Sequence, residues 1–262
     1  MAFAEINGCG LHYREDGDPD GAALVFGNSL GCDLRIWDDV VAQLPPGLRI
    51  LRYDMRGHGL SECPPGPYGM GTLVRDAEGL MDHLGLRDAV FVGLSLGGMV
   101  AQGLAVKRLD LVRGLVLACT AAKVGTAAQW QERIATVQGD GIAALLDATM
   151  ERWFTAGFRA TPDIGQWRNM VARQPAEGYA ACCAAISGTD FYTPTASLRL
   201  PCLGIAASED RATPPDLVRE TIALIPGARF ELLRRAGHLA CIEQPEAFGE
   251  LVNAFLRDIG HV

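Results

Sequence analysis

Residues 90–105 read VFVGLSLGGMVAQGLA, and in them Ser95 stands between Gly93 and Gly97, where a continuous apolar run gives way to an alanine-rich one. The apolar run predicts a buried strand, and the segment after it predicts a helix. Glycines at these two places leave room for a sharp turn, because side chains there would collide with neighbouring elements. A plain turn is the alternative, but the strand before Ser95 and the helix after it favour an activated nucleophile.

Similar apolar runs recur along the chain and predict the strands of one sheet. Short, continuous runs are typical of strands that helices cover on both faces, and such strands are parallel. Near the amino terminus, Asn7-Gly8 separates two strand-like segments, as expected for an antiparallel hairpin. The runs span residues 23–26, 48–53, 89–93, 114–119, 202–206 and 229–233, and the hairpin segments span residues 4–6 and 11–15.

Helical patterns alternate with these runs, at residues 34–44, 72–84, 96–106, 215–225 and 245–256. The alternation predicts an α/β fold with a mostly parallel sheet, flanked by helices and joined by right-handed crossovers. Residues 121–198 do not follow this alternation, because helical patterns succeed one another there without a strand-like run. The stretch is also too long for a simple connection. We therefore predict a core of residues 1–120 and 199–262 that carries residues 121–198 as an inserted helical cap.

A serine hydroxyl is a weak nucleophile and needs a general base, for which the chain offers five histidines. His58 lies in a glycine-rich turn after a strand, where a turn-stabilising role is expected. His238 follows the last predicted strand, which places it at the same edge of the sheet as Ser95 and makes it the candidate base. The others are expected to be solvated or packed, in the first hairpin, near a helix end and in the tail: His12, His83 and His261.

The third partner is a carboxylate that holds the imidazole in the correct tautomer and stabilises its cation. Asp210 closes the stretch that begins with the strand-like run at 202, and Pro214 indicates a loop that leads straight into a helix. Glu209 and Asp190 are the alternatives. The order serine, acid, histidine along the chain matches the order that a triad on this kind of alternating strand-and-helix fold uses.

The negative oxygen formed during acyl transfer needs two backbone N–H donors. Leu96, directly after the serine, can supply one. The loop Gly27-Asn28-Ser29-Leu30-Gly31, which follows the run at 23–26, can supply the other, and we predict that Leu30 does so. A plain glycine turn is the alternative.

Together these motifs resemble those of the α/β-hydrolase family, nearly from end to end. The strings that carry the resemblance are GNSLGCDLRIWD at 27–38, YDMRGHGLS at 53–61, VGLSLGGMVAQGLA at 92–105 and GHLACIEQPEAF at 237–248. The resemblance implies the nucleophile, acid and base roles for Ser95, Asp210 and His238, and the oxyanion-hole role for Leu30 and Leu96.

Within that family, the cap strings ERWFT and EGYAACCAAI and the Asn28-Ser29-Leu30 turn resemble the enol-lactonases. That resemblance implies a serine hydrolase that opens 3-oxoadipate enol-lactone to 3-oxoadipate in the protocatechuate branch of aromatic breakdown, without a metal or cofactor. Phe191-Tyr192-Thr193 and Ala240 depart from the pattern expected of these relatives, and these departures bear on the substrate rather than on the triad chemistry. The alternatives are a capped carboxylesterase, a hydrolase that cleaves carbon–carbon bonds of ring-cleavage products, and a small-molecule receptor that keeps the triad.

The implied lactone is a small anion, and a guanidinium is a natural partner for its carboxylate. Trp130 and Arg133 lie three positions apart on a predicted cap helix, so both can face a pocket. A core tryptophan and an exposed arginine are the alternative.

Composition limits the other partners. The formal net charge of −8 argues against nucleic acid and anionic membranes, since no basic run offsets it. No basic segment followed by an apolar one opens the chain, and no apolar stretch is long enough for a membrane span, so a cytoplasmic protein is expected. The eight cysteines form no CxxC pair, which predicts reduced, mostly buried thiols and no zinc site. The sequence predicts no oligomeric state.

Overall fold

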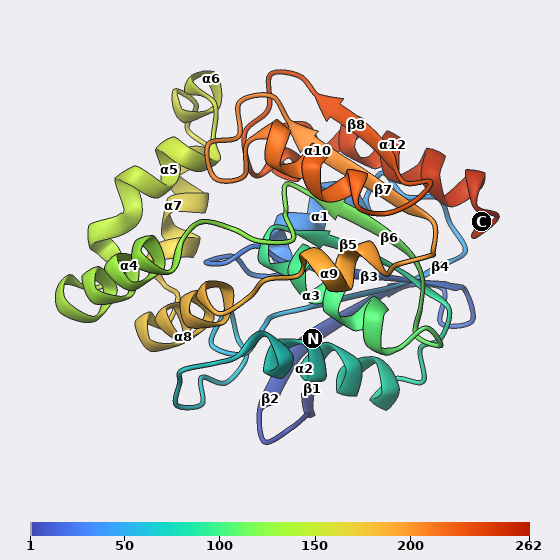
Figure 1. Cartoon of the computed structure of the whole chain (residues 1–262), viewed down its shortest axis with the longest axis horizontal. Coiled ribbons are helices and arrows are strands. Elements are labelled where there is room, and N and C mark those ends of the chain that lie inside the picture. Colours follow the sequence, from blue (N-terminus) through green and yellow to red (C-terminus); the bar gives the residue numbers. More distant parts are fainter. Residues whose placement is uncertain (1) are drawn as a thin grey trace.

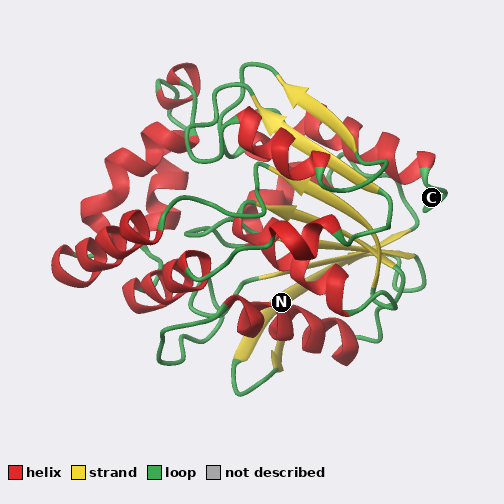
Figure 2. Cartoon of the chain, viewed as in Figure 1, coloured by secondary structure: helices red, strands yellow, loops and turns green. Residues whose placement is uncertain are grey.

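The computed structural model describes residues 2–262, and its centre is one eight-stranded sheet in the order β1-β2-β4-β3-β5-β6-β7-β8. β2 pairs antiparallel with β1 and β4, and all other neighbours are parallel. Figures 1 and 2 show the sheet twisting through the molecule. The strands are β1 (Ala2–Glu5), β2 (Gly10–Gly17), β3 (Ala22–Gly27), β4 (Leu48–Tyr53), β5 (Ala89–Leu94), β6 (Val112–Ala118), β7 (Cys202–Ala207) and β8 (Arg229–Leu233).

The predicted hairpin is present between β1 and β2. Asn7 and Gly8 both have positive φ, at 51° and 69°, as a two-residue hairpin turn requires. Ile6 and Cys9 close the turn with backbone hydrogen bonds of 2.9 and 3.1 Å. This hairpin adds an antiparallel edge to an otherwise parallel sheet.

Helices pack on both faces of the sheet. In Figure 1, α3 and α9 lie in front of the strands and α12 lies behind them. The helices outside residues 121–198 are η1 (Leu34–Trp37), α1 (Asp38–Val41), α2 (Met70–His83), α3 (Leu96–Lys107), α10 (Pro215–Ala223), α11 (Ala240–Glu243) and α12 (Pro245–Asp258). The predicted α/β architecture is confirmed.

The helix predicted over residues 34–44 is wrong in its length. The chain forms the short 3-10 helix η1, which Asp33 caps, and then α1, which ends at Val41. Pro45 and Pro46 follow Leu44, three residues after the end of α1. The residue before a proline is pushed out of the helical region, so the helix cannot continue to Leu44.

Only helices and loops lie between β6 and β7 in the described chain. Most of them form a layer beyond the sheet, on the side to which the arrowheads of β7 and β8 point, whereas α9 packs on α3 (Figures 1 and 2). They are α4 (Ala127–Asp140), η2 (Ile142–Leu145), α5 (Leu146–Trp153), α6 (Ala156–Arg159), α7 (Ile164–Ala172), α8 (Ala176–Ser187) and α9 (Tyr192–Ala196). The division into core and cap at residues 121 and 198 stays a prediction, and its boundary at residue 1 lies outside the described residues.

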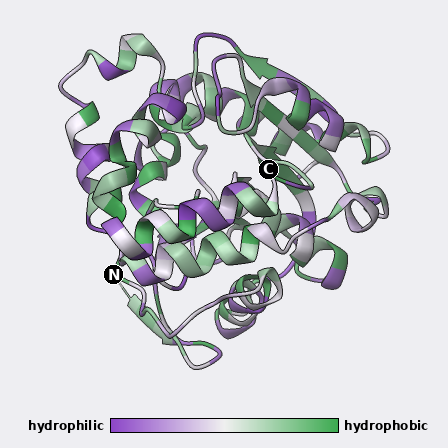
Figure 3. Ribbon diagram, turned by 60° about the vertical axis from the view of Figure 1, so that its left-hand side comes forward, coloured by the Kyte–Doolittle hydropathy of each residue, from purple (hydrophilic) through white to green (hydrophobic). Residues whose placement is uncertain are grey.

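The core follows the apolar runs that predict the strands. Every residue of β5 and β7 is buried, as is expected for central strands with helices on both faces. In Figure 3, the visible strands are mostly green and the helices around them mix purple and green. Across residues 2–262, no helix combines the length and apolarity that crossing a membrane requires.

Candidate active site

Ser95 lies on a strained turn between β5 and α3. Its φ of 55° and ψ of −114° are rare for a residue with a side chain, and such strain is typical of functional sites. The Ser95 N–H donates to the carbonyl of Ala118 at 2.9 Å, and the Thr120 hydroxyl donates to the Ser95 carbonyl at 2.6 Å. The backbone of Ser95 is therefore fixed from β6, and its side chain is left to face the cavity.

The flanking glycines make this turn possible. A Cβ on Gly93 would lie 2.4 Å from the Gly97 carbonyl oxygen, and a Cβ on Gly97 would lie 2.2 Å from the carbonyl oxygen of Gly27. The obstacles are backbone atoms, which cannot rotate away. The Gly97 N–H also donates to the Asn28 carbonyl at 2.9 Å, which joins the serine turn to the loop after β3.

His238 and Asp210 form a buried pair. His238 Nδ1 lies 2.8 Å from Asp210 Oδ2, and both side chains are almost fully enclosed. Asp210 Oδ1 accepts the N–H groups of Ala212 at 2.7 Å and Thr213 at 2.9 Å. Burial alone would raise the pKa of Asp210, but the adjacent His238 and these hydrogen bonds hold it below its usual value. The carboxylate therefore stays ionised beside the imidazole.

The alternative acids lie elsewhere. Glu209 is exposed, although it is the neighbour of Asp210. Asp190 is also exposed and pairs with Lys123 at 3.0 Å. Neither carboxylate contacts His238, so the structure brings only Asp210 to the candidate base.

The remaining histidines have structural contacts or face solvent. His12 Nδ1 lies 2.8 Å from Asp54, and His261 Nε2 lies 2.9 Å from the Ala23 carbonyl. His83 is exposed near the end of α2. His58 Nε2 accepts the Gly31 N–H at 2.9 Å, so this histidine fixes the loop after β3.

That loop brings Leu30 to the cavity that Ser95 also lines. The Asn28 side chain donates to the Tyr53 carbonyl at 2.8 Å and accepts from Trp37 Nε1 at 2.9 Å, which fixes the start of the loop. Leu30 and Leu96 both line the cavity that Ser95 lines. Leu96 is the first residue of α3, so its N–H has no acceptor within the helix and is free to bind an anion.

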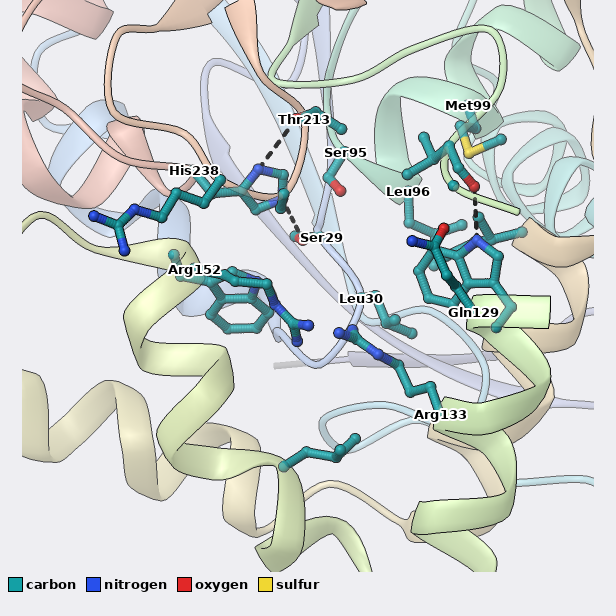
Figure 4. Close-up of a pocket in the computed structure, with 18 of the residues that line it drawn as sticks. Ser29, Leu30, Ser95, Leu96, Met99, Gln129, Arg133, Arg152, Thr213 and His238 are labelled. Atoms are coloured by element: carbon teal, nitrogen blue, oxygen red, sulfur yellow. Dashed lines mark hydrogen bonds between the residues drawn. The ribbon is translucent and has the colours of Figure 1, made fainter. Parts of the chain in front are cut away.

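The cavity has a volume of about 420 Å³, and Ser95 and His238 both line it (Figure 4). His238 Nε2 lies 3.5 Å from the hydroxyl of Ser29, which the figure also shows. Within residues 2–262 the polar contacts of the imidazole are that one and those to Asp210 and Thr213, and none is a hydrogen bond to Ser95. Catalytic hydrogen bonds often tighten only when substrate binds, so the shared cavity wall is the relevant geometry.

Two guanidinium groups enter the same cavity from the helical layer. Arg133 of α4 and Arg152 of α5 point toward one another in Figure 4. Arg133 stacks on the ring of Trp130, 5.3 Å from its centre, and donates to the Tyr179 hydroxyl at 3.3 Å. Burial and the charge of Arg133 lower the pKa of Arg152. Glu132 also lines the cavity, but within residues 2–262 no carboxylate forms a salt bridge with either guanidinium, so an anion would be stabilised between them.

Trp130 and Arg133 therefore lie together at the cavity wall, and Trp130 Nε1 donates to the Val124 carbonyl at 2.6 Å. That hydrogen bond fixes the indole ring on which Arg133 rests. Both residues thus line the cavity that Ser95 lines, and Figure 4 shows Arg133 pointing into it, whereas their role in substrate binding stays a prediction.

Three groups of the site could also be considered as metal ligands. One ligand atom each from Cys119, Asp210 and His238 lies within 4.8 Å of the others. However, burial raises the pKa of the Cys119 thiol well above its usual value, so the thiolate that a metal prefers is disfavoured. His238 Nδ1 and Asp210 already use each other as hydrogen-bond partners. The donor set fits an acid–base pair better than a metal centre.

Comparison with known proteins identifies the family of this chain. The model of the alpha/beta hydrolase family matches residues 19–251. The chain belongs to the alpha/beta hydrolase family. The fold that the motifs predict is therefore confirmed at the level of the family as well as in the sheet order.

This hydrolase is also similar to enol-lactonases, as the cap strings predict. It is 35% identical over 249 residues to 3-oxoadipate enol-lactonase 2 of Acinetobacter baylyi, with 94% of this chain and 93% of the relative covered. The crystal structure of the enol-lactonase from Burkholderia xenovorans LB400 has a TM-score of 0.95 and 39% identity, covering 98% of this chain and all of that one. A thermophilic esterase from Thermogutta terrifontis, with malate bound, has a TM-score of 0.93 and 27% identity over the full length of both chains.

The sequence interpretation of this hydrolase missed three residues at the cavity. Arg152 lies in the ERWFT string, but a cation on a helix has no signal that says which way it points. Ser29 precedes Leu30, and its burial beside His238 depends on the tertiary fold. The Thr213 hydroxyl lies 2.8 Å from Asp210 Oδ2 and 3.3 Å from His238 Nδ1, three residues after the acid. A hydroxyl so close to a candidate acid was the one available clue.

Proposed function

We propose that this chain is an ester hydrolase that opens 3-oxoadipate enol-lactone to 3-oxoadipate, in the protocatechuate branch of aromatic breakdown, through an acyl-enzyme on Ser95. The observation that carries the proposal is the meeting of Ser95 and the His238–Asp210 pair with Arg133 and Arg152 at one cavity. The similarity to enol-lactonases across nearly the whole chain supports the same substrate.

In this proposal, Ser95 Oγ attacks the lactone carbonyl while His238 Nε2 takes its proton. The ionised Asp210 keeps the proton on His238 Nδ1 and stabilises the imidazolium. The N–H groups of Leu30 and Leu96 stabilise the negative oxygen of the tetrahedral intermediate. The ring oxygen then leaves as an enolate, which takes up the proton and becomes a ketone.

The second half of the reaction releases the product. A water molecule gives its proton to His238 Nε2 and attacks the acyl carbon, and the imidazolium returns that proton to Ser95 Oγ. The product is a dicarboxylate. Each step uses groups of this chain and the substrate, so the proposal requires neither a metal nor a cofactor.

The carboxylate side arm of the lactone is recognised in this proposal by Arg133 and Arg152. These two cations have neutral hydrogen-bond partners, Tyr179 and Thr149, and they lie close enough to repel each other. A bound carboxylate relieves that repulsion and accepts hydrogen bonds from both groups. A small anionic lactone therefore fits the cavity better than a neutral ester of similar size.

The decisive experiment follows the loss of enol-lactone absorbance with the wild type and with Ser95→Ala. If the triad acts as a unit, the substitution lowers turnover by about a millionfold. Fast hydrolysis of simple aryl esters with no turnover of the enol-lactone would favour a carboxylesterase instead. Slow single-turnover hydrolysis with lasting retention of the ligand would favour a receptor.

Anion recognition has a separate test. Arg133→Ala and Arg152→Ala are each expected to raise KM for the lactone by about tenfold to a hundredfold, since a hydrogen bond to a charged group contributes about 1.5 to 3 kcal/mol. Neutral aryl esters provide the control, because their KM does not depend on either cation. An unchanged KM for the lactone in Arg133→Ala would remove this residue from the proposed carboxylate site.

A further inference from the structure

A short segment of the helical layer contacts both loops of the acid–base pair. The Arg211 N–H, next to Asp210, donates to the Arg152 carbonyl at 3.4 Å. The Leu239 N–H, next to His238, donates to the Trp153 carbonyl at 3.3 Å. Successive carbonyls at the end of α5 therefore hold the loops after β7 and β8.

The close approach at the histidine loop requires a glycine. A Cβ on Gly237 would lie 2.4 Å from the Trp153 carbonyl oxygen and 2.7 Å from Glu243 Oε1. The ring of Trp153 packs against the His238 ring, with centres 6.3 Å apart. The position of the imidazole is thus tied to the position of this segment.

Glu243 links the His238 loop to the segment that follows α5. Its Oε1 accepts the Gly237 N–H at 2.9 Å and the Thr155 N–H at 3.2 Å, and its Oε2 accepts the Thr155 hydroxyl at 2.7 Å. The Thr155 hydroxyl in turn caps α6 by accepting the Phe158 N–H at 3.2 Å. One carboxylate therefore binds the residue before His238 and the residue that starts the next helix.

This carboxylate is half-buried, and burial raises its pKa. Its partners are neutral donors, and no cation of residues 2–262 pairs with it. Burying a carboxylate without a cation is unfavourable unless hydrogen bonds compensate. The hydrogen bonds from Gly237 and Thr155 provide that compensation for Glu243.

The same segment carries the groups that face the cavity. Arg152 and Trp153 both line it, and they directly precede the Phe154-Thr155 step that Glu243 holds. A shift of this segment would move the Arg152 guanidinium and the His238 ring together. A misplacement of about 1 Å at a reacting group can cost about a hundredfold in rate.

We propose that Glu243 is a positioning residue, which links the segment Arg152–Thr155 to the His238 loop and thereby holds the imidazole where it can activate Ser95. The proposal rests on the proposed roles of Ser95 and His238. It does not depend on which ester is the substrate.

The experiment measures how fast an organofluorophosphonate labels Ser95, at a temperature well below the unfolding transition of each variant. In that reaction Ser95 Oγ forms a bond to phosphorus, fluoride leaves, and His238 takes the proton, so the rate reports activation of the serine without any lactone. Glu243→Ala is expected to slow labelling by about tenfold to a hundredfold. In Glu243→Gln the amide oxygen can still accept the two N–H groups, and the amide NH2 can donate to Thr155 Oγ1. The labelling rate of this variant is therefore expected to stay within a few-fold of the wild type.

Glu246→Gln is the matched control, because Glu246 lies three positions further along and is exposed. A second pair of variants changes Thr155, the hydrogen-bond partner of Glu243. Thr155→Val removes the hydroxyl and is expected to slow labelling, whereas Thr155→Ser keeps the hydroxyl and is expected to leave the labelling rate unchanged. These variants answer the question even if Glu243→Ala does not fold.

Labelling at the wild-type rate in folded Glu243→Ala, or in Thr155→Val, would overturn the proposal and leave Glu243 with a purely structural role. Equal slowing by Glu243→Gln and Glu243→Ala would also overturn it, because the hydrogen-bond geometry would then be irrelevant. A wild type that is labelled at Ser95 but does not open the enol-lactone contradicts the proposed function only.

Discussion

His58 is a buried histidine whose protonation should destabilise the fold. Its side chain is 1% exposed, and its Nε2 accepts the Gly31 N–H at 2.9 Å, so that nitrogen carries no proton in the folded chain. Its Nδ1 lies 3.4 Å from the Arg56 carbonyl, which fixes the neutral tautomer. Burial lowers the pKa of His58 from 6.5 to about 4.

The sign of the effect follows from the difference between the two states. The unfolded chain takes up the proton near pH 6.5, whereas the folded chain resists it until the pH falls to about 4. His58 therefore contributes stability above pH 6.5, and this contribution is lost as the pH falls toward 4. The total corresponds to about 3 kcal/mol, of which about 2 kcal/mol is lost between about pH 7 and about pH 4.5.

The assay is urea unfolding at a series of pH values for the wild type, His58→Gln and His83→Gln. Glutamine at position 58 can still accept the Gly31 N–H but does not titrate, so the free energy of unfolding should fall by about 2 kcal/mol less than in the wild type over this range. His83 is exposed, so its substitution should leave the slope unchanged. Parallel curves for the wild type and His58→Gln would refute a buried neutral imidazole at position 58.

Three further substitutions test the site and its support. Asp210→Asn should lower kcat by about ten-thousandfold while the protein stays folded, because the wrong tautomer is then favoured; a loss below tenfold would contradict its role. Gly97→Ala should lower the free energy of unfolding by about 3 kcal/mol, since the new Cβ meets the Gly27 carbonyl, and unchanged urea unfolding would contradict that contact. Asp76→Asn leaves the buried guanidinium of Arg56 without an ionic partner and with one acceptor oxygen fewer, and should cost about 3 to 5 kcal/mol in the same assay, whereas a neutral result would contradict a stabilising ion pair there.

The sheet and the serine turn could be predicted because their signals are local. An uninterrupted apolar run, two glycines and a following helical pattern lie within one short stretch around Ser95. Backbone contacts of 2.2 to 2.4 Å for a Cβ at Gly93 or Gly97 explain why no other residue could stand there. Close backbone contacts require glycine at fixed positions, and those glycines allow the turn to be predicted from the sequence.

Asp210 and His238 could be predicted for a different reason. Parallel strands end at a common edge, so residues that follow β7 and β8 must approach the residue that follows β5. This topological argument selects a small set of candidates, and exposure in the structure then separates Asp210 from Glu209. The hydrogen bond of 2.8 Å to His238 Nδ1 is the result that the pattern alone could not give.

Arg152 and Glu243 could not be predicted, because their roles depend on how the helical layer lies against the sheet. Both are charged residues on short helices, where a solvated side chain is the ordinary expectation. The proposed role of Arg152 depends on its position near Arg133 at the cavity, and that of Glu243 on hydrogen bonds from residues 6 and 88 positions away along the chain. Such contacts between distant segments have no periodic or local signal.

The sheet edge and the helical layer contribute different groups to the cavity. The sheet edge carries the proposed reacting groups, Ser95, Asp210 and His238, on loops whose geometry is fixed by backbone contacts and hydrogen bonds. The helical layer between β6 and β7 contributes Arg133 and Arg152 to the wall of the cavity, and the loop after β7 contributes Arg211. Because the end of α5 is hydrogen-bonded to the loops that carry Asp210 and His238, we expect a shift of Arg152 to move the imidazole as well. Substitutions in α5 that alter which ester is bound should therefore alter kcat as well as KM, and those in α4, which lacks these hydrogen bonds among the described residues, should act mainly on KM.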